Sequence, residues 1–234
     1  EMIRGFYTAA TSLVAQQTHL NVIANNVANV STTGFKPQQV GFASLLHSNI
    51  NGGAANTIQM GHGVRVQKTG INFVQGDLKQ TDMPLDFAIM GEGFFAVENA
   101  VDGTIAYTRD GSFQASIDGR RTYLIDAQGN YVLDSRERRI ELDDDFDHKQ
   151  IGVFRFANPY GLELVGGNRF VPTEASGDPE DVDEPDIKVG YLENSSVQLS
   201  QEIVKMIEAS KGFSLGSKVL QAADEMERTI NQLR

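Results

Sequence analysis

The sequence predicts an α+β fold in which long N- and C-terminal helices pair as a coiled-coil-like unit and flank a β-rich middle domain of hairpins. Three observations predict it. Apolar residues recur at steps of three and four near the N-terminus. The same spacing returns near the C-terminus, which predicts a second helix that can pair with the first. Between the two, turn signals such as Asp-Gly separate short apolar runs, as they do in β-hairpins.

Residues 1–36 are expected to form an axial helix that ends in a signature turn. A hydroxyl-rich run, Ser31-Thr32-Thr33, meets Gly34 and then Pro37, and such a sequence ends a helix. The predicted heptad seam consists of Ile3, Phe6, Ala10, Leu13, Gln17, Leu20, Ala24 and Val27.

Residues 197–234 are expected to form a second axial helix with two heptad frames. The frames differ by one residue across Gly212 to Gly216, so we expect an under-packed or offset seam there. The first frame consists of Leu199, Ile203, Met206, Ser210 and Phe213, and the second of Val219, Ala223, Met226, Ile230 and Leu233, with Leu220 beside it.

The middle domain is expected to span residues 37–196. Asp102-Gly103 and Asp118-Gly119 mark turns between apolar runs such as Phe94–Val97 and Tyr123–Ile125. Residues 178–186 are rich in acids and contain two prolines, which predicts a solvated loop.

Composition narrows the class of protein. The chain has 234 residues, 40% of them hydrophobic and 22% charged, which is ordinary for a folded, soluble protein. Its net charge of -11 argues against nucleic-acid binding, and no apolar run is long enough for membrane insertion. The absence of cysteine excludes disulfides and thiolate sites. The N-terminus has no basic segment followed by an apolar one, so the sequence does not predict a cleavable secretory signal.

Motifs for catalysis or metal binding are weak. Gly212 to Gly216 matches G-x-S-x-G around Ser214, but it falls inside a helical pattern instead of after a strand, so a serine hydrolase is the minor alternative. Asp143, Asp145 and Asp147 alternate like the start of a calcium loop, yet the later ligand positions do not match. We therefore expect a protein that is not an enzyme and has no catalytic, cofactor or metal site.

Three segments together resemble one family. They are Gln16–Lys36, which contains A-N-N-V-A-N-V-S-T-T-G-F-K; Leu85–Val97 with Tyr107–Phe113 shortly after; and Gly190–Val197 with the helix that follows. In this order they resemble the flagellar hook–basal body rod proteins. Within that family the resemblance is to a distal rod subunit, and a proximal rod or hook-type axial subunit is the alternative.

The resemblance implies a structural subunit of the bacterial flagellar basal body that self-assembles into a hollow helical rod. Its partners would be further copies, other axial proteins of the rod and hook, and the flagellar export apparatus. It would lie outside the cytoplasm, in the periplasm or cell wall, and be exported without a cleavable signal peptide. An adhesion module that forms no polymer is a further alternative.

The assembly interface is expected on the terminal segments. Asn25, Asn26 and Asn29 match the signature, and their amides could set register with neighbouring chains. The expected interface consists of Ile3, Phe6, Leu13, Leu20, Asn25, Asn26, Val27, Asn29, Phe35, Leu199, Ile203, Met206, Phe213, Leu220, Met226, Ile230 and Leu233. The chain also departs from the family pattern, because the stretch between Val132 and Gly152 is short, which predicts a trimmed middle domain.

Overall fold

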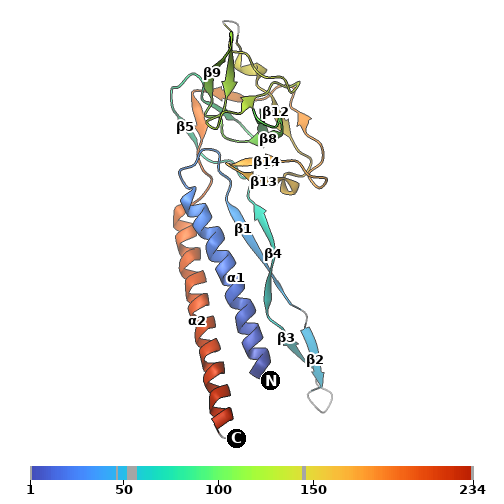
Figure 1. Cartoon of the computed structure of the whole chain (residues 1–234), viewed down its shortest axis with the longest axis vertical. Coiled ribbons are helices and arrows are strands. Elements are labelled where there is room, and N and C mark those ends of the chain that lie inside the picture. The colour runs from blue at the N-terminus through green and yellow to red at the C-terminus, as the bar shows by residue number, and fades with distance from the viewer. Residues whose placement is uncertain (1, 46, 52–56, 144–145, 233–234) are drawn as a thin grey trace. The chain divides into compact units, whose positions relative to one another are not determined.

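The computed structural model describes residues 2–45, 47–51, 57–143 and 146–232. A long helix lies at each end and strands occupy the middle, which confirms the predicted α+β class (Figure 1). The chain forms two compact units. Unit 1 comprises Glu1–Ala28, Gln38–Ile71 and Gln198–Arg234, and unit 2 comprises Asn29–Pro37 and Asn72–Val197. Residues 38–71 thus group with the helices, whereas the sequence predicts one middle domain over residues 37–196.

Unit 1 is built on two helices that pack side by side, α1 (Met2–Ala28) and α2 (Leu199–Gln232) (Figure 1). They are antiparallel, because Asn26 near the end of α1 meets Glu202 near the start of α2. With a rise of 1.5 Å per residue, α1 is about 40 Å long and α2 about 50 Å long. The longer α2 therefore extends beyond the N-terminal end of α1.

The buried stripe of α1 differs from the predicted seam, in which Phe6, Gln17 and Ala24 are exposed. Ala9 and Ile23 are buried, whereas the predicted Ala24 is exposed. The physical reason is that α1 packs on α2 along one side and on two strands along another, so a wider stripe is buried than a two-helix seam requires. Three other residues of the predicted seam, Leu13, Leu20 and Val27, are half-buried.

The seam at Gly212–Gly216 is closely packed, so the under-packing predicted there is wrong. Helix α2 runs through this stretch without a break. A Cβ atom added to Gly212 would lie 3.1 Å from the side chain of Gln16, and one added to Gly216 would lie 3.0 Å from Leu13. The two glycines thus lie in the seam and allow α1 to approach α2 closely.

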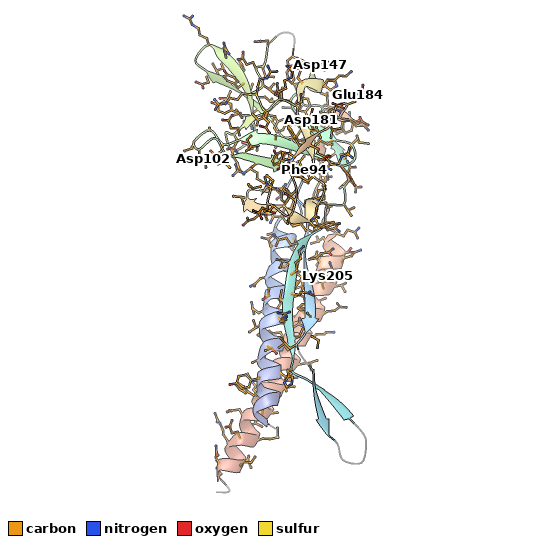
Figure 2. All side chains as sticks on the ribbon, turned by 90° about the vertical axis from the view of Figure 1, so that its right-hand side faces the viewer. Phe94, Asp102, Asp147, Asp181, Glu184 and Lys205 are labelled. Atoms are coloured by element: carbon orange, nitrogen blue, oxygen red, sulfur yellow. The ribbon has the colours of Figure 1, made fainter. Side chains whose placement is uncertain are left out.

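A two-stranded sheet accompanies α1. Strand β1 (Gln38–Ser44) pairs antiparallel with β4 (Val64–Ile71), with an irregularity at Gly41/Phe42, and both contact α1 (Figures 1 and 2). Between them, β2 (His47–Asn51) pairs with β3 (Thr57–Gly61). Unit 1 is therefore a helix pair with one long β-hairpin.

Unit 2 contains one large antiparallel sheet and two smaller strand pairs. The turns at Asp102-Gly103 and Asp118-Gly119 join β7 to β8 and β9 to β10, as predicted. The large sheet has the order β13-β14-β8-β7-β11-β10-β9, and β12 joins β7 to β15. The smaller pairs are β16–β6 and β17–β5. The strands are β5 (Leu78–Gln80), β6 (Phe87–Ile89), β7 (Phe94–Glu98), β8 (Ile105–Thr108), β9 (Gln114–Asp118), β10 (Arg121–Ile125), β11 (Tyr131–Val132), β12 (Val153–Arg155), β13 (Glu163–Gly166), β14 (Arg169–Val171), β15 (Glu180–Asp181), β16 (Ile187–Val189) and β17 (Tyr191–Glu193).

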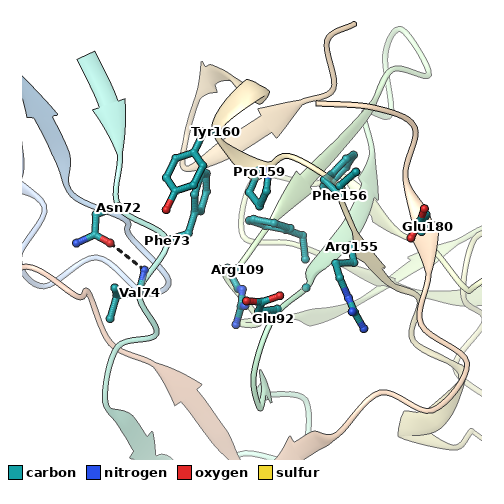
Figure 3. A pocket seen from close by; sticks show the side chains of 13 residues that line it. Asn72, Phe73, Val74, Glu92, Arg109, Arg155, Phe156, Pro159, Tyr160 and Glu180 are labelled. Atoms are coloured by element: carbon teal, nitrogen blue, oxygen red, sulfur yellow. Dashed lines mark hydrogen bonds between the residues drawn. The ribbon is translucent and has the colours of Figure 1, made fainter. Parts of the chain in front are cut away.

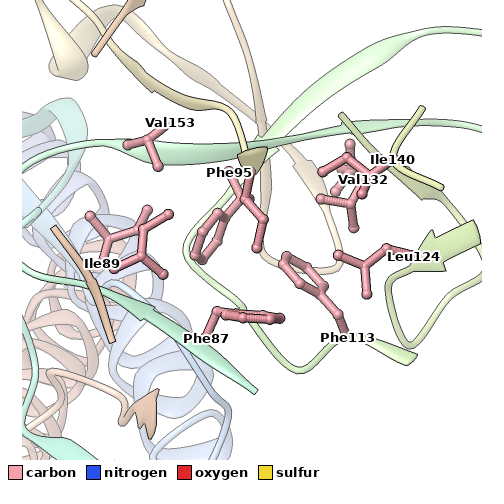
Figure 4. Packing of buried hydrophobic residues seen from close by; sticks show 11 residues of the cluster. Phe87, Ile89, Phe95, Phe113, Leu124, Val132, Ile140 and Val153 are labelled. Carbon is pink, nitrogen blue, oxygen red and sulfur yellow. The ribbon is translucent and has the colours of Figure 1, made fainter. Parts of the chain in front are cut away.

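The core of unit 2 lies between β6, β7 and the strands that pair with them. Figure 4 shows Phe87, Phe95 and Phe113 at its centre, where Phe113 makes an edge-to-face contact with Phe95 and a tilted contact with Phe87. Two of these rings come from the segment Leu85–Val97, in which almost every residue of β6 and β7 is buried. This burial on both faces explains why the segment is a continuous apolar run and not an alternating one.

Candidate functional site

Three charged residues from three distant segments meet in the interior of unit 2. Lys36 follows the signature turn, Arg109 lies in the Tyr107–Phe113 segment, and Glu193 ends β17. The Nζ atom of Lys36 lies 2.5 Å from Oε1 of Glu193, and Nη1 of Arg109 lies 3.1 Å from Oε2. Each of the three segments that resemble the family thus contributes one charge to a single cluster, which we call the ion triad.

The ion triad is almost fully removed from solvent. The exposed side-chain fractions are 1% for Lys36, 5% for Arg109 and 1% for Glu193. Burial lowers the pKa of Lys36 and of Arg109, and the nearby Glu193 carboxylate opposes this shift in both. Two cations face one carboxylate, so the cluster contains an excess positive charge whose desolvation is costly unless each N–H group has a partner.

Backbone groups provide most of the remaining partners. Lys36 also donates to the carbonyl of Val74 at 2.8 Å, and Arg109 donates to the carbonyl of Gly91 at 2.6 Å. The N–H of Gly76 donates to Oε1 of Glu193 at 2.9 Å. Among the described residues, Nε of Arg109 has no hydrogen-bond partner.

The backbone beside the ion triad explains the glycine of the signature. Gly34 has a φ of 63°, and a Cβ atom there would lie 2.6 Å from the carbonyl carbon of Arg109. Its N–H donates to the carbonyl of Glu193 at 2.7 Å, and Ser196 N–H donates to the carbonyl of Phe35 at 3.2 Å. The segments 34–36 and 193–196 are therefore held side by side, one leading from α1 and the other toward α2.

Asn26 joins three elements of unit 1. Its side chain is 1% exposed. Its Nδ2 donates to the carbonyl of Gln38 at 2.8 Å and to the Glu202 carboxylate at 3.1 Å, and its Oδ1 accepts from Gln38 N–H at 2.9 Å. The amide is thus used inside the chain, which differs from the expected hydrogen bond to a neighbouring chain. Lys205 donates to the same carboxylate at 2.6 Å.

The remaining expected interface residues fall into three groups. Phe35 is buried in unit 2, so it offers no surface to another chain. Half-buried positions are Leu13, Leu20, Val27, Asn29, Met206, Phe213 and Leu220. Exposed positions are Phe6, Asn25, Leu199, Ile203, Met226 and Ile230. The side chains of Ile3 and Leu233 lie outside the described residues.

Sequence reasoning missed part of the exposed apolar surface of the helices. Outside the predicted seam, Tyr7 and Val14 are exposed on α1, and Val204, Ile207 and Leu215 on α2. Val219 was predicted for the pairing seam of α2, yet the seam passes through Gly216 and the half-buried Leu220 instead. A heptad count that assigns each helix one partner could not show that several rows of apolar residues remain uncovered.

The catalytic alternatives find no geometric support. Ser214 is exposed in the middle of α2, whereas a nucleophile elbow needs a strand before it and a helix after it. Within the described part of the chain, no group of three His, Asp or Glu side chains could hold a metal ion. Asp145 of the acidic run lies outside the described residues. No helix in the described part of the chain is long and apolar enough to cross a membrane.

Comparison with known families identifies the class of protein. Residues 6–36 match the family "Flagella basal body rod protein", residues 88–153 match "Flagellar hook protein FlgE/F/G D1 domain", and residues 188–233 match "Flagellar basal body rod FlgEFG protein C-terminal". Each of the three matches contains one member of the ion triad. The fold and the matches define an axial protein of the flagellum.

The chain belongs to the family of flagellar basal-body rod proteins. It is 35% identical to a protein named "Flagellar basal-body rod protein FlgG" from Buchnera aphidicola subsp. Schizaphis graminum, over 99% of this chain and 100% of the relative. It is also 35% identical to the protein of that name from Borreliella burgdorferi, over 100% and 99%, and 31% identical to the one from Bacillus subtilis, over 100% of both. The alignments span 262 to 272 positions, more than this chain contains, so the relatives have residues without a counterpart here.

Proposed function

We propose that this structural subunit of the flagellar rod assembles through its terminal helices into a hollow helical tube. The exposed apolar surface of α1 and α2 carries the proposal. Large apolar side chains are exposed on both helices of a chain whose composition is otherwise that of a soluble protein. Full burial of such a side chain contributes about 1.5–3 kcal/mol, and these side chains are about half exposed, so each would add about half of that value when a neighbouring copy covers it.

A groove on unit 1 supports the same proposal. It has a volume of about 360 Å³ and lies between α1 and β4. Ala10, Val14 and Ala15 line it from the helix, and Val64 and Val66 from the strand. An apolar groove beside protruding apolar side chains provides the two surfaces that repeated packing of one chain needs.

Family membership supports a proposal for where the protein lies. We propose that the chain occupies the distal and not the proximal part of the rod, which the full-length similarity to proteins named FlgG supports. Its partners would be further copies, other rod and hook proteins, and the export apparatus. It would function in the periplasm or cell wall as a non-enzymatic component, reached without a cleavable signal. Within and between copies, the helices would pair in the manner of a coiled coil.

Substitution of exposed apolar residues on α2 tests the proposal. Ile203→Ser combined with Ile230→Ser should leave the folded chain as stable as the parent, because both side chains are exposed. Assembly into sedimenting polymers, and swimming of cells that carry only this variant, should be lost. The matched control is Ile117→Ser, an exposed isoleucine on unit 2. Unchanged polymer formation by the double variant would reject the helices as the assembly surface.

A further inference from the structure

A cavity in unit 2 has preformed aromatic walls. Its volume is about 630 Å³, within the range of cavities that receive a ligand or a group of side chains. Figure 3 shows Tyr160 and Phe73 on one side and Arg155 on the other. Phe73 makes edge-to-face contacts with Phe94 and Tyr160, at ring-centre distances of 5.6 and 5.9 Å. Such contacts hold the walls in place before anything binds.

The cavity has charged groups that can orient an occupant. Arg109 of the ion triad lines it, and one of its buried N–H groups lacks a partner among the described residues. Arg155 is exposed, and it makes no ion pair with the described residues. Glu92 and Glu180 also line the cavity, and Glu180 is the antiparallel partner of Arg155 across β12 and β15, so the lining offers both signs of charge.

An apolar side chain protrudes from the turn between β7 and β8. Val101 is 94% exposed, the highest fraction among the exposed large apolar residues. The turn is held by its own hydrogen bonds: Asn99 N–H donates to the Thr104 carbonyl at 2.9 Å, and Thr104 N–H donates to Oδ1 of Asp102 at 3.1 Å. Gly103, with a φ of 70°, permits this turn. A valine and a carboxylate are therefore presented on a rigid tip.

The cavity and the tip lie at opposite ends of β7. Phe94, which begins the strand, lines the cavity, and the tip follows Glu98, which ends it. The strand alone separates them by about 13 Å, and the turn adds to this. Figure 2 shows Asp102 at the edge of unit 2, well away from Phe94. The other two apolar hairpin tips, at Ile117 and Val165, do not lie beyond this end of β7.

We propose that the tip at Val101–Asp102 of one copy inserts into the aromatic cavity of a second copy. The valine would pack on Phe73 and Tyr160, and the Asp102 carboxylate would pair with Arg155. Because donor and acceptor surfaces lie at opposite ends of one strand, the contact is head-to-tail, and a contact of this type can repeat from copy to copy, as a helical array requires. The inference rests on the proposed assembly of copies, and it adds a contact that the terminal helices do not make.

Cysteine crosslinking of the full chain tests this contact directly, since the natural sequence has no cysteine. Two variants are mixed at a concentration that favours assembly, Val101→Cys in one and Ala157→Cys, at the cavity wall, in the other, and then mildly oxidised. The control mixture replaces the first variant with Ile117→Cys, also highly exposed at 79%. Docked side chains have a high effective concentration, so we expect the test mixture to give at least about tenfold more mixed dimer than the control.

Three results separate the possible outcomes. Addition of Arg155→Glu to the Ala157→Cys chain should lower the mixed-dimer yield several-fold if the carboxylate pairs with this arginine. Equal yields in the test and control mixtures would overturn the contact, whether or not polymers form. Sedimentation of the same samples reports separately on the proposed function, since polymers that form without this crosslink would leave the helix-mediated assembly standing. Circular dichroism of each variant confirms that the exposed substitutions leave the fold intact.

Discussion

Replacement of Glu193 by Gln removes the single negative charge of the ion triad with almost no change in side-chain volume. The variant leaves Lys36 and Arg109 buried, with exposed side-chain fractions of 1% and 5%, and with no carboxylate between them. Loss of one partner from a buried ion pair costs about 3–5 kcal/mol, because the other charge stays uncompensated. Here two cations lose their partner, so we expect a loss of unfolding free energy in the upper part of that range.

Removal of one cation should lower the unfolding free energy less than removal of the carboxylate. Lys36→Met removes one of the two cations and leaves Arg109 paired with Glu193, so the cluster becomes neutral. The remaining penalty is the unpaired carbonyl of Val74, about 1–3 kcal/mol. The ordering of the two variants, more than the absolute value, therefore tests the idea that the carboxylate holds the cluster together.

Urea unfolding followed by tyrosine fluorescence measures the effect where it should occur. The chain has no tryptophan, and of its six tyrosines only Tyr7 belongs to unit 1. The control is Glu163→Gln, the same change at an exposed carboxylate. A loss below about 1 kcal/mol for Glu193→Gln, the level of a surface ion pair, would refute the reasoning. An equal loss for Lys36→Met would refute the assigned role of the carboxylate.

Three further substitutions test other parts of the chain. Asn26→Ala should lower the unfolding free energy by about 2–4 kcal/mol, because it leaves its buried hydrogen-bond partners unpaired. Its control, the exposed Asn21→Ala, should cost under about 0.5 kcal/mol. Urea unfolding followed by far-UV circular dichroism measures both. Gly34→Ala should lower the stability of unit 2 by about 2–4 kcal/mol, because the added Cβ meets nearby backbone. Its control, Gly119→Ala, has a similar positive φ with open space around it and should cost about 1 kcal/mol. Glu98→Gln should make urea stability less sensitive to acid as the pH falls below the ordinary glutamate pKa of 4.5.

The sign of the acid effect follows from the contact of Glu98 with Arg139. The two bonds from Arg139, at 2.8 and 2.9 Å, lower the pKa of Glu98 below its ordinary value. The unfolded chain therefore binds more protons than the folded chain between the two pKa values. The stabilisation is present above the unfolded pKa and is lost as the pH falls through the folded one, so an unchanged acid sensitivity in Glu98→Gln would contradict this account. The Asn26→Ala prediction would be contradicted if Asn21→Ala lost as much stability. The Gly34→Ala prediction would be contradicted if Gly119→Ala lost as much.

Local signals in the sequence identified most of the elements. Asp-Gly pairs located two hairpin turns, because few residues other than glycine accept a positive φ at low cost. The heptad count located both helices but chose Ala24 over the adjacent Ile23. Adjacent apolar residues such as these make the frame ambiguous, and only the position of a second neighbour, the β1–β4 sheet, resolves it.

The ion triad could not be derived in this way. Its members are separated by 84 and 157 positions along the chain, and charge alone does not specify which partner a lysine takes. The sequence does contain one hint, since Lys36 stands between Phe35 and Pro37 in an otherwise apolar and turn-forming stretch. Lysine is nonetheless mostly exposed in proteins, so this context alone does not predict the buried position.

The geometry of the helix pair gives a separate reason to expect assembly. Residue numbers of facing positions on α1 and α2 add to nearly the same value, as Leu13 with Gly216 and Asn26 with Glu202 show. Continued to the start of α1 at Met2, this register ends near Met226 on α2. The last turn and a half of α2 therefore has no α1 residue beside it, and Ile230 is exposed there. An isolated helix end of this kind gains little from its own propensity, so its apolar residues are stabilised only when another chain covers them.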